Sequence, residues 1–177
     1  MKRKLFSEIP YLRRGRVELK KLDASHAAGL EEMRKNPRVY RYLPTFLFEQ
    51  KYEDVGYVID HLYDECRKES IILGVFYDGE FAGLAEMYGY MDAIHKISIG
   101  CRLTERYWGC GIASEVVFLL VDYLYEETDI EIITASNMVE NQGSANVLKK
   151  TGFDLVVHAA EEDWGYETPT IADKWIR

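Results

Sequence analysis

The feature that most constrains this sequence is a change of hydrophobic period after a short loop that contains two glycines. Residues 95–103 read as a strand, and Gly109 and Gly111 follow it. Beyond the loop, apolar residues recur every three or four positions, as on one face of a helix. These residues are Ala113, Val116, Val117, Leu120, Val121 and Leu124. A strand, a loop and the strongest helix of the chain therefore follow one another here.

The segment before this unit predicts a strand and then two helices. Residues 17–22 alternate as a strand does, and Asp23 has the side chain of a helix cap. Apolar stripes then mark a first helix and a second one over residues 53–67. The stripes comprise Ala27, Leu30 and Met33 in the first helix, and Val55, Ile59, Leu62 and Cys66 in the second.

A hairpin follows these helices. Residues 71–77 and 81–90 flank Asp78-Gly79, a pair of residues that suits a type I′ turn. The two strands should therefore be antiparallel. With residues 95–103 they predict a meander of three consecutive strands.

After the long helix, strands alternate with one further helix. Residues 130–135 form a short β-branched strand, and Asn141 can cap a helix that stops at Gly152. Residues 153–159 and 168–176 read as the last strands. The order of elements is that of an α+β domain.

Length and composition fit a single domain over residues 1–177. The 22 Lys and Arg against 30 Asp and Glu give a net charge of -8, which disfavours nucleic-acid binding. A negative net charge would favour a cationic small molecule or peptide as partner, but it can also serve only to keep the protein soluble. No run reaches membrane-spanning length, and the three cysteines lack the spacing of a disulfide framework or a zinc site. We therefore expect a cytoplasmic protein without a metal, nucleic acid or membrane partner.

The glycine loop has the chemistry of a pyrophosphate cradle. Free N–H groups at a helix N-terminus attract phosphate, and glycines allow close approach. A Walker A loop would end in Gly-Lys-Ser/Thr, and a Rossmann fingerprint would have a small residue at Ser114 and an early βαβ unit. Taken alone, Gly109 and Gly111 could equally form only a tight turn.

Two motifs resolve this alternative by resemblance. Residues 106–113, Arg-Tyr-Trp-Gly-Cys-Gly-Ile-Ala, resemble the coenzyme A loop of GNAT acetyltransferases, Arg/Gln-x-x-Gly-x-Gly/Ala. The Tyr-Trp-Gly form is typical of the branch with ribosomal-protein N-terminal and polyamine or antibiotic N-acetyltransferases. Residues 141–153 resemble the second signature of that branch, Asn-x-x-Ser-x-x-Val-Leu-x-Lys-x-Gly-Phe, and residues 99–103 are similar to its splayed strand.

The resemblance implies the GNAT fold, with a mixed, mostly antiparallel central sheet of about seven strands flanked by helices. It also implies acetyl-coenzyme A as cosubstrate. The implied contacts are Cys101, Arg102 and Leu103 for the acetyl and pantetheine portion, Arg106, Tyr107, Trp108, Gly109, Cys110, Gly111, Ile112 and Ala113 for the pyrophosphate, and Asn141 and Ser144 along the pantetheine.

Acetyl transfer to an amine requires a base, an oxyanion donor and a proton for the leaving thiolate. Glu86 is the candidate base. An acidic side chain on the buried face of a strand is costly, so Glu86 either has a catalytic role or points to solvent. Leu148 stands where many family members have a tyrosine acid, so Ser144 is the nearest replacement, although capping or packing also explains it. An acetyl-cysteine intermediate at Cys101 or Cys110 is disfavoured, because neither has a histidine nearby in sequence.

The expected acceptor is a primary amine: a small polyamine-like or antibiotic amine, or a protein N-terminus. Aromatic residues of the early helices and last strands either bind it or belong to the core. They are Tyr40, Tyr42, Phe46, Trp164 and Tyr166. We expect an N-acetyltransferase that works by direct attack in a ternary complex, and the alternative is an acetyl-coenzyme A sensor without turnover. The sequence also allows a homodimer.

Overall fold

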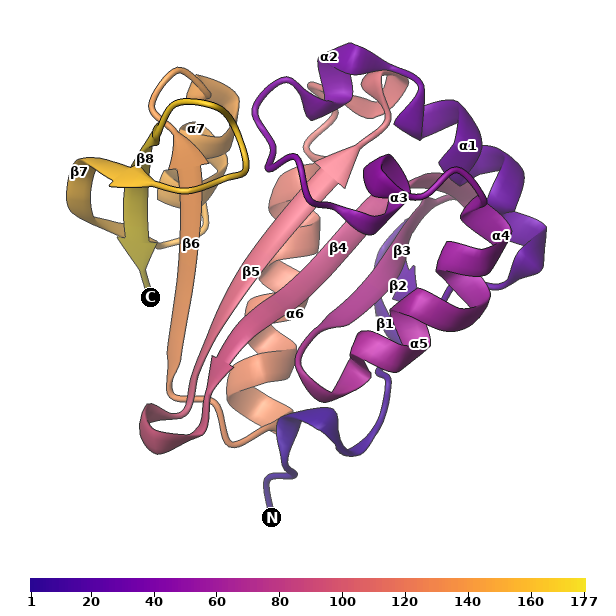
Figure 1. Ribbon diagram of the computed structural model, residues 1–177. Coiled ribbons are helices and arrows are strands. Elements are labelled where there is room, and N and C mark those ends of the chain that lie inside the picture. Colours follow the sequence, from indigo (N-terminus) through magenta and orange to yellow (C-terminus); the bar gives the residue numbers. More distant parts are fainter.

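The computed structural model describes residues 1–177 and arranges them around one twisted sheet of eight strands (Figure 1). The strand order is β1-β2-β3-β4-β5-β6-β8-β7, and only β5 and β6 pair in parallel. The predicted mixed, mostly antiparallel α+β sheet is therefore confirmed. The strands are β1 (Leu12–Arg14), β2 (Val17–Lys20), β3 (Ile71–Tyr77), β4 (Glu80–Met91), β5 (Lys96–Leu103), β6 (Ile132–Met138), β7 (Asp154–Glu162) and β8 (Thr170–Ile176).

The sheet has one strand more than the seven expected, and that strand is β1. It pairs antiparallel with β2 through a turn in which Gly15 has a φ of 58°. Only Leu12 of its three residues is buried. A strand this short, with two arginines, carries too little alternation to be recognised in a sequence.

The central meander is as predicted. The strands β3, β4 and β5 pair antiparallel in succession. Asp78 and Gly79 both have positive φ values, 50° and 83°, as a type I′ turn requires. The turn is tight enough to bring Tyr77 opposite Glu80.

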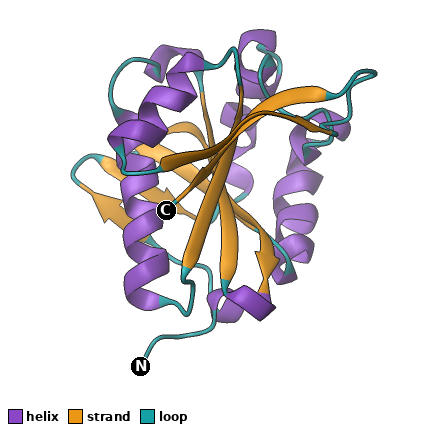
Figure 2. Ribbon diagram, turned by 90° about the vertical axis from the view of Figure 1, so that its left-hand side faces the viewer, coloured by secondary structure: helices purple, strands orange, loops and turns teal.

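Helices cover both faces of the sheet (Figure 2). The larger core lies between the sheet and α6, and a smaller one lies under the helices that precede β3. The helices are α1 (Ala27–Arg34), α2 (Pro37–Tyr40), α3 (Phe48–Lys51), α4 (Val55–Tyr57), the π-helical η3 (Val58–Leu62), α5 (Tyr63–Glu65), α6 (Ile112–Glu127) and α7 (Gln142–Lys150), with 3-10 turns η1 (Leu5–Ser7), η2 (Ala24–His26), η4 (Cys66–Lys68), η5 (Asp92–Ile94) and η6 (Glu105–Tyr107).

The helix predicted over residues 53–67 is present but irregular. It changes from α to π to α and ends in a 3-10 turn. A π turn holds more residues than an α turn, so the buried stripe rotates. Val58 and Tyr63 therefore join Val55 and Ile59 in the core, whereas Leu62 is only partly buried.

The strands β5 and β6 form a V (Figure 1). Their parallel pairing covers only Lys96 to Ser98 against Ile132 to Thr134. At the vertex, the hydroxyls of Ser98 and Thr134 are 2.8 Å apart. From there to Leu103, β5 has no neighbour on its β6 side, so the backbone groups on that edge are free to bind a ligand.

The straight course of β5 depends on the close approach of β4 at Gly83. This glycine has a φ of 155°, and an added Cβ would lie 2.1 Å from the Arg102 carbonyl oxygen. We predict that Gly83→Ala lowers the free energy of unfolding by about 3 kcal/mol, because the backbones would have to separate. Urea unfolding measures this loss.

Gly79→Ala is the matched control, because Gly79 also has positive φ but nothing lies within 4 Å of an added Cβ. It should cost about 1 kcal/mol, the strain of a left-handed residue alone. Equal losses in the two variants would show that the contact of Gly83 with β5 is unimportant.

Candidate functional site

A cleft of about 1310 Å³ occupies the V. Its walls come from β4 and β5 on one side and from β6, β8 and α7 on the other, and the start of α6 closes one end. Most of the residues predicted to bind the cofactor or act in catalysis line it. They are Glu86, Cys101, Arg102, Leu103, Tyr107, Trp108, Gly109, Gly111, Ile112, Ala113, Asn141 and Ser144.

Two of the predicted residues, Arg106 and Cys110, do not line the cleft. The Arg106 side chain is exposed and its guanidinium carbon lies 4.9 Å from the Tyr107 ring centre. Cys110 is exposed, and its thiol donates to the Trp108 carbonyl at 3.5 Å. Their backbone groups lie in the glycine loop, and the contacts that the resemblance implies for these two residues stay predictions.

Aromatic side chains fix the glycine loop in place. The Trp108 indole donates to the Leu103 carbonyl at 2.9 Å, and the Tyr107 ring packs on Tyr77. Gly109 and Gly111 have φ values of 71° and 78°, and no atom would meet a Cβ at either position. The loop is therefore held from its flanks while its glycine backbone stays open.

No side chain caps the N-terminus of α6, whose N-cap residue is Gly111. The one acid of its first turn, Glu115, is bound by Arg14 at 3.0 Å. The first amides of a helix without a cap are unsatisfied donors with a positive partial charge. This end of the cleft can therefore hold an anion.

The side chain of Arg102 is buried and bound within the protein. Its Nε lies 2.5 Å from Glu49 Oε1, and its Nη1 lies 3.4 Å from Glu86 Oε2. The hydroxyls of Tyr40 and Tyr63 also donate to Glu49, at 3.2 and 3.1 Å. Any contact of Arg102 with a cofactor must therefore come from its backbone.

Glu49 is ionised despite its complete burial. Burial alone would raise its pKa, but the Arg102 guanidinium more than offsets this effect, so the pKa of Glu49 lies below its ordinary value of 4.5. For Arg102, burial lowers the pKa, and the Glu49 and Glu86 carboxylates raise it well above its usual range. The pair is therefore charged at neutral pH.

Glu86 points into the cleft and not to bulk solvent. It pairs with Gly100 of β5, and its side chain is 18% exposed. A Cβ on Gly100 would lie 3.3 Å from Glu86 Oε1, so the missing side chain at Gly100 leaves the carboxylate its space. Glu86 is thus partly exposed toward the cleft, where a ligand can reach its carboxylate.

The second signature forms the opposite wall. The Asn141 side chain caps α7 by accepting from the Ser144 amide at 3.2 Å, as predicted. Ser144 lines the cleft one turn into α7, and its hydroxyl makes no hydrogen bond within the protein. Leu148, one turn further along α7, is buried and also lines the cleft.

Two of the three cysteines, Cys66 and Cys101, lie in surroundings that keep the thiol protonated. Burial raises the pKa of Cys101 to about 12 and that of Cys66 to about 11. A thiol that keeps its proton is a poor nucleophile. His95 lies outside the cleft near Asp129.

Two loops meet across the opening of the V (Figure 1). The Thr45 amide donates to the Trp164 carbonyl at 2.9 Å, and the Tyr166 hydroxyl donates to the Leu43 carbonyl at 2.6 Å. An added Cβ at Gly165 would lie only 2.0 Å from the Thr45 hydroxyl. These contacts roof the part of the cleft that faces Glu86.

Several lining residues are not evident from the sequence. Glu49 and Lys174 look like ordinary surface residues there, because each lies in a segment with mixed polarity. Tyr88 follows Glu86 on the same face of β4. Only one sequence feature could have pointed to Glu49 as a lining residue: its position beside Phe48, in a segment rich in aromatic residues.

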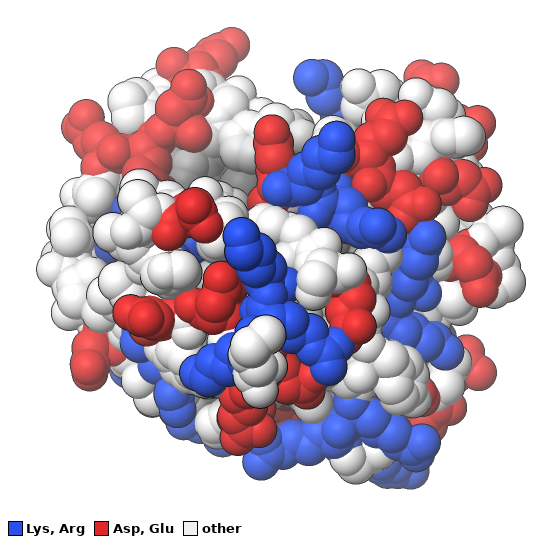
Figure 3. Space-filling model, turned by 90° about the horizontal axis from the view of Figure 1, so that it is seen from below, with Lys and Arg blue, Asp and Glu red and all other residues white.

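Positive and negative side chains are mixed on the surface. Seen from below, the molecule carries Lys and Arg side chains interspersed with Asp and Glu (Figure 3). None of the helices combines the length and the apolar character needed to cross a bilayer. No group of three or more His, Cys, Asp or Glu side chains is arranged to hold a metal ion.

Comparison with known proteins identifies relatives. A family model described as Acetyltransferase (GNAT) domain matches residues 16–154. The chain is 33% identical over 90 residues to the probable N-acetyltransferase YjcK of Bacillus subtilis (strain 168), a match to 49% of this chain and 50% of that protein. It is 24% identical over 143 residues to the spermidine N(1)-acetyltransferase of Escherichia coli (strain K12), covering 78% of this chain and 73% of that one.

A solved structure has the same fold. The ribosomal L7/L12 alpha-N-protein acetyltransferase RimL, in complex with coenzyme A, superposes with a TM-score of 0.81 at 19% identity. The superposition covers 95% of this chain and 97% of that one.

The Glu49 and Arg102 pair gives a stability prediction. Glu49→Gln should lower the free energy of unfolding by about 3 kcal/mol at pH 7, because it leaves the Arg102 charge buried without its partner. Urea unfolding tests this value. Asp64→Asn is the control, because it removes an exposed pair with Lys21 and should change stability by about 0.5 kcal/mol or less.

The same pair predicts a pH dependence. Because the pKa of Glu49 is lower in the folded state, its contribution is fully present above its unfolded value of 4.5 and is lost as the pH falls below it. The stability gap between wild type and Glu49→Gln should therefore narrow below about pH 4.5. A gap independent of pH would mean that Glu49 is not ionised.

Proposed function

Because the chain belongs to the GNAT acetyltransferase family, we propose that it transfers the acetyl group of acetyl-coenzyme A to a primary amine. Relatives named as N-acetyltransferases support turnover over the alternative of a sensor. The acceptors in the names of similar proteins are a polyamine and a protein N-terminus, both of which are amines.

One observation carries this proposal: the open V ends at an uncapped helix. The free edge of β5 lies beside the glycine loop and the first turn of α6 in a single cleft. Such a cleft suits a long ligand with an extended amide-bearing arm and a pyrophosphate. The pantetheine would lie along Ile99 to Leu103 and reach Asn141 and Ser144, with the pyrophosphate at the amides of residues 109–114.

The side chains on the cleft walls suit direct attack. Glu86 would take a proton from the ammonium form of the acceptor and pass it to solvent. The neutral nitrogen then forms a bond to the acetyl carbonyl carbon, and Glu86 would take the second proton, which that nitrogen loses as it becomes an amide. A β5 amide near Cys101 would donate to the oxyanion. As the bond between carbon and sulfur breaks, the Ser144 hydroxyl would give its proton to the thiolate and regain one from solvent.

The cradle is tested by coenzyme A binding. Gly111→Ala should weaken binding by about ten-fold or more, because a hydrogen bond from an amide to a charged phosphate depends on the left-handed turn there. Isothermal calorimetry measures this effect. Gly15→Ala is the control, because Gly15 has a similarly positive φ but lies in the turn between β1 and β2. If wild type does not bind coenzyme A, the proposed function is wrong.

The catalytic roles are tested by steady-state thiol release. Glu86→Gln should lower kcat by about 100-fold, and Ser144→Ala by about 10-fold, because each removes one proton transfer. Neither should weaken coenzyme A binding to a comparable degree. Glu80→Gln, an exposed acid on the same strand, should leave kcat unchanged. An unchanged rate in either variant would remove that residue from the mechanism.

A further inference from the structure

We propose that the acceptor carries a single positive charge, its reacting amine, on an aromatic or apolar body. This inference rests on the proposed function and concerns the part of the cleft around Glu86. It depends on which charged side chains of the cleft already have partners, and on which do not.

Two of the carboxylates in the cleft are already bound. Glu49 has no exposed surface, and it accepts hydrogen bonds from Arg102, Tyr40 and Tyr63. Glu162 forms an ion pair with Lys174 and accepts from the Trp164 indole at 2.8 Å. Neither can receive a second ammonium without losing these partners.

The remaining two carboxylates differ in position. Asp163 is exposed at the roof, where it accepts from the Gly165 amide at 2.9 Å. Glu86 lies inside, and its nearest cation is the Arg102 Nη1 at 3.4 Å. Because Arg102 faces both Glu49 and Glu86, the cluster holds one positive charge against two negative ones. The excess of one negative charge matches one ammonium.

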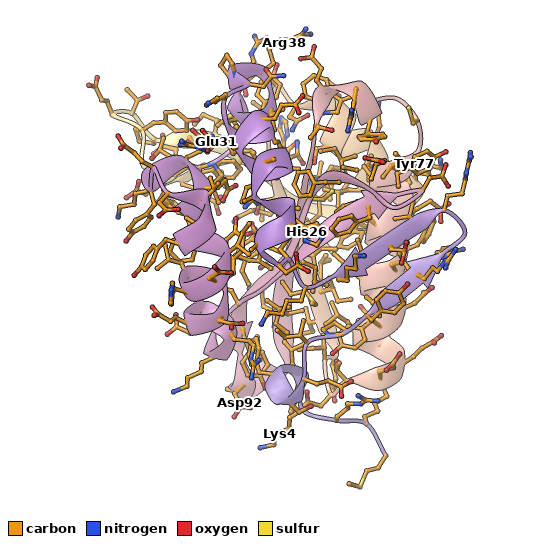
Figure 4. The ribbon with its side chains drawn as sticks, turned by 90° about the vertical axis from the view of Figure 1, so that its right-hand side faces the viewer. Lys4, His26, Glu31, Arg38, Tyr77 and Asp92 are labelled. Carbon is orange, nitrogen blue, oxygen red and sulfur yellow. The ribbon has the colours of Figure 1, made fainter.

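The cations of the cleft disfavour a second positive charge. Arg41 is exposed, lies over the Tyr42 ring at 5.1 Å and forms no ion pair with a carboxylate. Arg38, which projects from the upper end of the molecule in Figure 4, pairs with Glu105. Inside the cleft, a polyamine would therefore bring a further ammonium near the unpaired Arg41 or to carboxylates that already have partners, at a desolvation cost. Asp163, which has no ion pair, lies at the roof and is exposed to solvent, where an added ion pair contributes little.

The walls instead offer apolar surface. Phe46 lines the cleft and is 55% exposed. Such a large exposed apolar side chain is available to contact a ligand. Other rings extend this surface toward Glu86. Apart from Tyr107 and Trp108 beside the glycine loop, the aromatic lining comprises Tyr42, Phe46, Phe48, Tyr88 and Trp164. An aromatic or apolar body would bury this surface on binding.

Two sources can supply this chemistry: a free arylalkyl amine, or a peptide whose N-terminal residue is aromatic. The test compares kcat/KM for 2-phenylethylamine and for a peptide with N-terminal Phe against spermidine and putrescine. At least one aromatic monoamine should exceed both polyamines by about ten-fold or more, as expected for a pocket built for an apolar group. Comparing the amine with the peptide then shows which source the cleft accepts.

A variant with one added carboxylate tests the effect of charge separately from that of the acceptor's apolar body. Ser70 lines the cleft, and Ser70→Asp would add a second carboxylate there. The ratio of kcat/KM for spermidine to that for 2-phenylethylamine should rise about ten-fold. Ser70→Asn places a side chain of nearly the same shape as Asp there but without its charge, so it should leave this ratio unchanged.

The outcomes separate the two proposals. If spermidine or putrescine is the better substrate of wild type, the acetyltransferase function stands and the inference about a single charge is wrong. If no amine of either kind is acetylated although coenzyme A binds, the proposed function itself is wrong. A rise of the ratio in Ser70→Asp but not in Ser70→Asn would support the inference.

Discussion

The rest of the structure depends on the early separation of β5 and β6. Two parallel neighbours would normally continue their ladder, because unpaired backbone groups are costly when buried. Here the ladder ends after Ser98 and Thr134. The separation is stable because each strand has a separate partner, β4 for β5 and β8 for β6. The free backbone groups of β5 are thereby exposed to a ligand.

Each wall of the V is held by a buried polar contact. On one side, Arg102 of β5 is bound by Glu49 of α3, which ties the strand to the helices before β3. On the other side, Asn137 of β6 accepts from the Trp175 indole of β8 at 2.6 Å. These contacts satisfy polar side chains that line the cleft, and the space between the walls stays open. Buried polar groups of this kind favour one arrangement because the alternatives leave them unpaired.

Much of the fold was predictable because it rests on local signals. The period of residues 113–124 and the Asp78-Gly79 turn depend only on near neighbours, and both are confirmed. The irregular helix over residues 53–67 was not predictable in detail, because its π turn is set by packing. The strand β1 was missed because three residues show no period.

The site was predictable where a motif covers it and not where distant residues meet. The resemblance led to the glycine loop and to residues 141–153, which line the same cleft. It did not indicate that Glu49 would bind Arg102, because 53 positions separate them in the chain. The role of the Arg102 side chain, which balances two carboxylates, was therefore not predicted from the sequence.

The alternation of β5 explains how the proposed site for an anionic cofactor and Glu86, the proposed base, can lie in one cleft of an acidic protein. Ile99 and Cys101 pack toward the core under α6, and Arg102 points to the opposite face, where it meets Glu86. The positive end of α6 and the carboxylate of Glu86 therefore act on different parts of the cleft. The net charge of -8 does not oppose the cofactor strongly, because local donors at short range outweigh screened charges at long range. One strand, with its side chains on alternate faces, thus separates the anion site from the site that a cation would enter.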